Sequence, residues 1–276
     1  MNGGASRPGQ SGLSLPSALA AFAAALALML LVAPVAGAFG VWGIALVQIV
    51  AIGGPVIVVA HLASPRPLCA LGLRAPSARA LAGAALVGAS FWYLNLRFVV
   101  PLGDRLAGDD ASVARIADIL ADPTIPLWAT LILLAVLPAV CEELLFRGAL
   151  ARALRPLAGI AGAIVLQAVM FSLFHVSPAR LLPTLCFGIV LGAIALASHS
   201  TLASAVTHGL NNAFAIVLAS AAGAPIAHAI DASGHVATAV AAGLTGTGLW
   251  LALAPRPPRE VRRPDAPSDP PKLDSG

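Results

Sequence analysis

The chain has 276 residues and a formal net charge of +4 at pH 7, with 59% hydrophobic and only 10% charged residues. Soluble domains carry far more charge, so this composition excludes an ordinary soluble protein and indicates a polytopic membrane protein. The three cysteines form an odd count without zinc-site spacing, which implies neither a disulfide framework nor a structural zinc site.

Apolar runs follow one another along almost the whole chain. Residues 1–16 are polar and rich in glycine and serine, and we expect them to be disordered. Apolar runs long enough to cross a bilayer then lie at residues 18–39, 40–63, 80–101, 126–150, 157–176, 181–198, 202–222 and 236–254. The tail at 255–276 is rich in proline and arginine and cannot bury a core, so it is also expected to be disordered. The predicted fold class is all-α, a membrane domain at 17–254 with about eight transmembrane helices.

The distribution of positive charge predicts an orientation. Eight spans put both termini on one side of the membrane, and twelve of the sixteen lysines and arginines fall in segments on that side, against three on the other. The positive-inside rule then places both termini in the cytoplasm. These basic residues orient the protein in the lipid bilayer, so no nucleic-acid partner is expected. The alanine-, arginine- and proline-rich composition, without organelle signals, favours a bacterial inner membrane.

A short amphipathic helix is expected in the loop between the third and fourth spans. Val113, Ile116, Ala117 and Leu120 recur there at helical spacing. We interpret this segment as a surface helix.

Two adjacent glutamates and an arginine interrupt the apolar run at 126–150. A charged side chain in hydrocarbon is costly, so Glu142, Glu143 and Arg147 form a functional-site hypothesis. On a helix, Glu143 and Arg147 are one turn apart and can form an ion pair. Glu142 points about 100° away from Glu143 around the helix, so it takes no part in this ion pair and is available for a different function. A structural salt bridge alone would explain Glu143 and Arg147 but not Glu142.

Further polar side chains lie in the later spans at matching depth. Phe171 and His175 are one helical turn apart, as are His208 and Asn212. If the fourth and fifth spans form a hairpin near residues 156–159, Glu142 and His175 each lie about sixteen residues from the turn, or ~24 Å. His208 and Asn212 also fall inside the bilayer, roughly 12 to 18 Å from the turn near residue 200. The helices can therefore enclose an intramembrane chamber where these side chains meet.

Three motifs in this order carry a family resemblance. Glu142-Glu143-x-x-x-Arg147, Phe171-x-x-x-His175 and His208-x-x-x-Asn212 resemble the signatures of the CAAX-protease and bacteriocin-processing (CPBP, or Abi) family of intramembrane proteases, which includes the type II CAAX prenyl endopeptidases. The resemblance covers residues 126–222. It implies a metal-free, glutamic-type membrane endopeptidase in which Glu142 and His175 activate water and His208 and Asn212 form the oxyanion site. Glu143, Arg147 and Phe171 would support them.

The residue chemistry is compatible with those roles. Amide hydrolysis needs a base for water, an acid for the leaving amine and donors for the oxyanion. A carboxyl group removed from water becomes a stronger base, which suits Glu142. Because the chamber lies below the membrane surface, the expected substrate is a membrane-embedded or lipid-anchored protein or peptide tail.

Several alternatives remain open from the sequence. Glu142, His175 and His208 could instead ligate a catalytic Zn²⁺, although HExxH is absent. Cys141 could act as a nucleophile, but an apolar site disfavours its thiolate. A non-catalytic membrane immunity or binding protein, or a proton-coupled transporter, could show similar hydropathy, although the paired repeats typical of transporters are missing.

Overall fold

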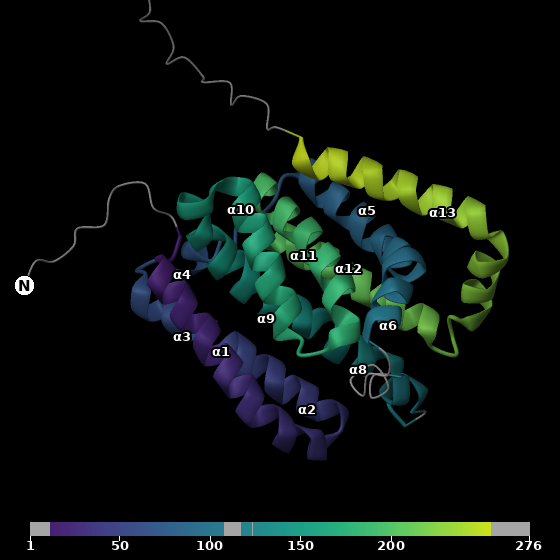
Figure 1. Ribbon diagram of the computed structural model, residues 1–276, viewed down its shortest axis with the longest axis horizontal. Coiled ribbons are helices and arrows are strands. Elements are labelled where there is room, and N and C mark those ends of the chain that lie inside the picture. Colours follow the sequence, from purple (N-terminus) through teal and green to yellow (C-terminus); the bar gives the residue numbers. More distant parts are fainter. Residues whose placement is uncertain (1–11, 108–116, 123, 255–276) are drawn as a thin grey trace, which may run out of the picture.

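The structure is a computed structural model that describes residues 12–107, 117–122 and 124–254 (Figure 1). The described residues form helices and no strands, which confirms the predicted all-α class. The helices are α1 (Leu15–Ala36), α2 (Val41–Leu46), α3 (Gly54–Ala63), α4 (Pro67–Ala70), α5 (Ala78–Leu94), α6 (Val100–Ala107), α8 (Leu127–Leu131), α9 (Leu137–Glu143), α10 (Ala151–Phe174), α11 (Pro178–Ser198), α12 (Thr201–Ala219) and α13 (Ala224–Leu253). A 3₁₀ turn, η1 (Gly37–Phe39), and wide π-helical segments, η2 (Val47–Gly53), η3 (Asn95–Val99), η4 (Ile132–Val136) and η5 (Leu144–Leu150), connect some of them.

The ends of the chain differ only slightly from expectation. Helix α1 begins at Leu15, with the Ser14 hydroxyl accepting a hydrogen bond from the Ser17 N–H, so the helix starts two residues before the predicted membrane domain. The disorder predicted for the first eleven residues and for 255–276 lies outside the described residues.

Within the described ranges, seven helical segments are long and apolar enough to cross a membrane, one fewer than predicted. The difference comes from the segment Leu127–Phe174, which runs for 48 residues and merges the two spans predicted at 126–150 and 157–176. A straight helix of that length would measure ~72 Å, more than twice the ~30 Å of a hydrocarbon core. The segment is instead broken at Gly159, where φ is +69° and ψ is −175°.

The break at Gly159 turns the segment into a hairpin. The rings of Phe146 and Phe171 have centroids 5.0 Å apart although 25 positions separate the two residues, so the arms before and after the turn lie side by side. The two arms correspond to the two spans predicted from the sequence. Their merging into one segment accounts for the count of seven.

The helices that carry the candidate residues lie between two outer layers. In Figure 1, α1, α2 and α3 cover one side of α9 and α10, while α5 and α13 lie on the opposite side, next to α12. Phe22 of α1 packs on Phe146 and Phe174 with centroid separations of 6.1 and 5.8 Å, which ties the first layer to the hairpin. On the other side, the Thr207 hydroxyl of α12 donates to the Ala84 carbonyl of α5 at 3.0 Å.

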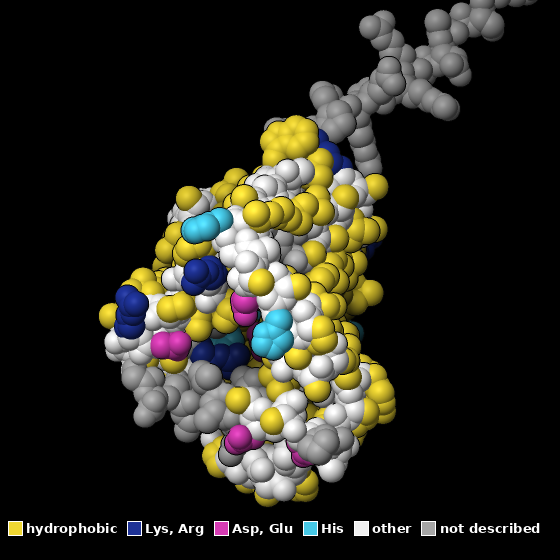
Figure 2. Space-filling view, turned by 90° about the vertical axis from the view of Figure 1, so that its right-hand side faces the viewer, with side chains coloured by type: hydrophobic (Ala, Val, Ile, Leu, Met, Phe, Trp, Pro, Cys, Tyr) yellow, Lys and Arg dark blue, Asp and Glu magenta, His cyan; other side chains and the backbone are white. Residues whose placement is uncertain are grey.

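Large apolar side chains cover much of the outer surface. Leu62, Leu31, Trp250, Val236 and Trp128 are each exposed over more than 60% of their surface. In Figure 2, charged and histidine side chains gather around a hollow in the middle of the face shown, and apolar side chains dominate its right-hand margin. A contiguous apolar exterior is unfavourable in water and favourable against lipid tails, so the surface fits an integral membrane protein.

The amphipathic helix expected around residues 113–120 is only partly covered by the structure. Val113 and Ile116 lie outside the described residues, whereas 117–121 are helical.

The hairpin turn gives a testable expectation. Gly159→Ala should lower the free energy of unfolding by about 1–3 kcal/mol, because its combination of positive φ and extended ψ is one that essentially only glycine adopts. The space around Gly159 is otherwise open, with no atom within 4 Å of an added Cβ. Gly243→Ala is the matched control, since Gly243 is also open but lies in regular helix and should gain about 0.5–1 kcal/mol. Thermal denaturation in detergent, followed by circular dichroism, measures both, and equal melting temperatures would contradict the assigned turn.

Candidate active site

Irregular backbone on both sides of α9 positions the glutamates. Pro138 stands in the first turn of α9, where it lacks an N–H and its ring conflicts with the carbonyl four residues earlier, that of Leu134. The helix widens into η4 just before this proline and into η5 just after Glu143. π-helical turns of this kind often occur at functional sites, because they redirect side chains and leave carbonyl groups free.

Glu142 is 8% exposed and is held by a residue from a distant span. The Gln48 amide nitrogen, on η2, donates to Glu142 Oε1 at 2.8 Å. Glu142 Oε2 lies 4.0 Å from His208 Nε2. One carboxylate oxygen is therefore fixed by an amide donor, and the other faces an imidazole.

Glu143 is fully buried and joins two helices. Its Oε1 accepts from the Arg147 guanidinium at 2.7 Å, so the ion pair expected from the four-residue spacing is present. The same oxygen lies 2.9 Å from His208 Nδ1 on α12. Since a carboxylate can only accept, Nδ1 carries the proton in this contact, and Glu143 fixes the orientation of the His208 ring.

Arg147 is buried completely and is enclosed by polar and aromatic groups. One terminal nitrogen donates to the Gly188 carbonyl at 3.3 Å, and the guanidinium carbon lies 4.3 Å from the Phe171 ring centroid. The Gln167 amide donates to the same Gly188 carbonyl at 2.9 Å. Phe171 therefore provides the aromatic face for a buried cation, and a guanidinium in this setting gains cation–π as well as ionic stabilisation.

His175 follows the last residue of α10. Its Nδ1 lies 2.8 Å from the Phe171 carbonyl oxygen, which must accept, so Nδ1 carries the proton and Nε2 has a free lone pair. The next residue, Val176, has a φ of +48°, an outlier for a β-branched residue. His175 lies within electrostatic range of Glu142 and His208 and lines a cavity of about 380 Å³ with Met29 and Ala33.

Asn212 lies one turn beyond His208 and contacts the irregular backbone of the motif segment. Its amide nitrogen donates to the Leu134 carbonyl at 3.2 Å, the group that Pro138 leaves without its helical partner. Its amide oxygen accepts from Asn211 at 3.3 Å. The second N–H of the Asn212 amide remains available for another acceptor.

The structure thus brings Glu142, Glu143, Arg147 and His208 into one cluster, with Phe171 beside it. Within the described parts of the chain, no three histidine, cysteine, aspartate or glutamate side chains are gathered as a metal-ligand set, and this includes the alternative set of Glu142, His175 and His208. Cys141 lies against Gly53 of η2, where an added Cβ would be 3.0 Å from its Sγ, so its thiol points toward a neighbouring span.

Gln48 is the residue that sequence reasoning missed. It lies within the apolar run at 40–63, and a buried amide in a span is a signal of the same kind as a buried carboxylate. Its partner, however, is 94 positions away, which no local spacing indicates.

A comparison with family models matches residues 124–214 to the family described as type II CAAX prenyl endopeptidase Rce1-like. The match covers about a third of the chain and contains all three motifs, so the predicted resemblance is confirmed over these residues. Gln48 lies outside the matched segment. Comparisons with curated proteins and with solved structures gave no match.

The buried ion pair predicts an asymmetric response to mutation. Arg147→Met should destabilise the protein by about 3–5 kcal/mol, because it leaves Glu143 buried without its cation. The double variant Glu143→Gln/Arg147→Met removes both charges and should recover most of that loss. Melting temperature and the yield of monodisperse protein in detergent report both effects. A single variant as stable as the wild type would show that the pair is not a buried ionic contact.

Proposed function

We propose that the protein is an intramembrane endopeptidase of the glutamic type, which cleaves a peptide bond in a membrane-associated protein or peptide. The family match at 124–214 supports a CAAX-type endopeptidase. The observation that carries the mechanism is the placement of Glu142 between the Gln48 amide at 2.8 Å and His208 Nε2 at 4.0 Å.

Glu142 is the proposed general base. It removes a proton from a water molecule that it shares with His175, whose Nε2 lone pair can accept a second hydrogen bond from that water. The water oxygen then attacks the carbonyl carbon of the substrate and forms a tetrahedral oxyanion. Glu142 finally delivers the proton to the leaving amine, and the C–N bond breaks.

His208 and Asn212 are the proposed oxyanion donors. With Glu143 held on Nδ1, His208 can donate from Nε2 only when it carries a second proton. Asn212 would contribute the N–H that Leu134 does not occupy.

The proposed substrate is apolar or lipid-anchored near the cleavage point. Glu142 is buried among membrane-spanning helices, and an ordinary hydrophilic loop would have to give up its hydration to reach it. The membrane-embedded end of a protein or peptide tail is already out of water, so it reaches Glu142 without losing hydration.

Glu142→Ala, His175→Ala and His208→Ala should each abolish cleavage while leaving folded protein in the membrane. Asn212→Ala should lose about 10²–10³-fold in rate, the usual effect of removing one oxyanion donor. Cys141→Ser is the control and should stay active. The measurement compares membrane proteomes of cells that carry each form and identifies the protein termini that depend on Glu142.

Two outcomes would change the proposal. Full activity in Glu142→Ala would indicate a non-catalytic binding or immunity protein. Loss of cleavage with a chelator and recovery with Zn²⁺ would indicate a zinc-dependent protease that uses Glu142, His175 and His208 as ligands.

We also propose that both chain ends face the cytoplasm of a bacterial cell, as the arginine distribution favours. A reporter fused after Gly276 should then be active only as a cytoplasmic reporter, and one inserted at Asp122 only as an exported one. The reverse pattern would overturn this orientation.

A further inference from the structure

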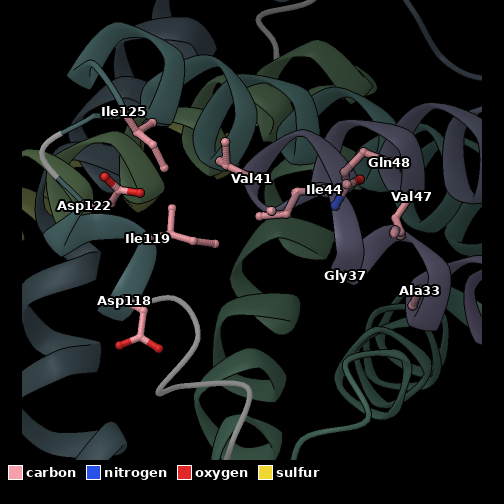
Figure 3. Close-up of a pocket in the computed structure, with 13 residues that line it drawn as sticks. Ala33, Gly37, Val41, Ile44, Val47, Gln48, Asp118, Ile119, Asp122 and Ile125 are labelled. Atoms are coloured by element: carbon pink, nitrogen blue, oxygen red, sulfur yellow. The ribbon is translucent and has the colours of Figure 1, made fainter.

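A cavity of about 390 Å³ lies at one end of the helix bundle. One wall comes from the end of α1, the turn into α2, and η2. The other comes from Asp118, Ile119, Asp122 and Ile125, which precede α8. Figure 3 shows Ile119 and Ile44 pointing toward each other across the open space between these walls. The volume is within the range of ligand-binding pockets.

Small residues keep this space open. The wall formed by α1 and the following turn contains alanines and glycines, among them Ala33, Gly37 and Gly40. Gly43 packs so closely on Ala36 that an added Cβ would collide with the Ala36 carbonyl oxygen. The two segments are thus fixed against each other by backbone contact. The larger described side chains on this wall are Val41, Ile44, Val47 and Gln48.

Gln48 connects the cavity to the glutamate cluster. It lines the cavity, is 7% exposed, and holds Glu142 through its amide nitrogen. Its amide oxygen, Oε1, has no hydrogen-bond partner among the described residues. That oxygen is buried and does not face the cavity, so the link between the cavity and the glutamate cluster is the amide nitrogen bonded to Glu142.

Two carboxylates lie on the opposite wall. Asp118 and Asp122 are both exposed and line the cavity. The Thr124 hydroxyl and backbone N–H donate to Asp122 Oδ1 at 2.7 and 2.8 Å, and these bonds lower the pKa of Asp122 below its ordinary value. The described residues that line this cavity include two carboxylates and no basic side chain, so this lining favours a cation.

We propose that this cavity is the substrate-binding site leading to Glu142, and that it takes a small apolar peptide segment flanked by a basic side chain that pairs with Asp118 and Asp122. The apolar part of the peptide lies between Ile44 and Ile119. The proposal rests on the proposed endopeptidase function and adds to it a charge preference and a point of entry.

Cysteine labelling tests the cavity without any substrate. In protein with Cys69, Cys141 and Cys186 replaced by alanine, Ile44→Cys is treated in detergent with a cationic or an anionic methanethiosulfonate reagent. Ala222→Cys, in the exposed turn between α12 and α13, corrects for the different intrinsic reactivities of the reagents. After this correction, the cationic reagent should label Ile44→Cys roughly three or more times as fast as the anionic reagent, as expected near two carboxylates.

Asp118→Asn together with Asp122→Asn should return the ratio of these two labelling rates to about one, because both acceptors remain while their charges are lost. No labelling of Ile44→Cys, or a ratio that the double variant does not change, would overturn the proposed site.

Cleavage of defined peptides separates this inference from the proposed function. The panel keeps one small apolar core and places lysine, glutamine or glutamate at successive flanking positions. Wild-type protein should prefer lysine to glutamate by about tenfold at one position, and the Asp118→Asn/Asp122→Asn variant should lose that preference while still cleaving the glutamine peptide. Glu142-dependent cleavage without charge preference would refute the inference alone. Cleavage that persists in Glu142→Ala would refute the proposed function.

Discussion

The need to neutralise buried charge within the membrane determines the arrangement around the motif helix. Two carboxylates and a guanidinium are buried among membrane-spanning helices, and an unpaired ion there would cost several kcal/mol. Glu143 meets this need through Arg147 on its own segment and His208 on α12. Neighbouring elements provide partners for the other charged groups. The Gln48 amide donates to Glu142, and the Gly188 carbonyl of α11 accepts from Arg147. These polar contacts thereby join four separate spans.

Irregular backbone makes this convergence possible. A regular helix would keep every carbonyl within its own ladder, but Pro138 releases that of Leu134, which Asn212 then binds. The positive φ of Gly159 reverses the chain, so Phe171 returns to the side of Arg147. Pro138 lies in an apolar run that would otherwise continue as plain membrane helix, whereas Gly159 lies at the turn expected near residues 156–159. Departures from regular geometry at these positions are therefore part of how the site is built.

Local patterns were sufficient to predict much of this structure. Long apolar runs located the spans, and the four-residue spacing of Glu143 and Arg147 predicted their ion pair. The hairpin near residues 156–159 was also expected, and it explains why two predicted spans form one segment. Contacts between distant spans were not predictable, because nothing in the spacing of Gln48 links it to Glu142 across 94 positions. The bond from His208 to Glu143 likewise depends on how α12 rotates against α9, which helix packing decides.

The order of these partners along the chain also bears on how the protein enters the membrane. Gln48 is synthesised before Glu142, so its amide is already in the bilayer when the motif helix arrives. Arg147 follows Glu143 by four residues and can enter with it as an ion pair. Without such partners, each glutamate would raise the free energy of helix insertion by about 2.5–3.5 kcal/mol. His208 comes 65 positions after Glu143, so its contacts with both glutamates form last, once α12 has joined a bundle whose charges are already matched.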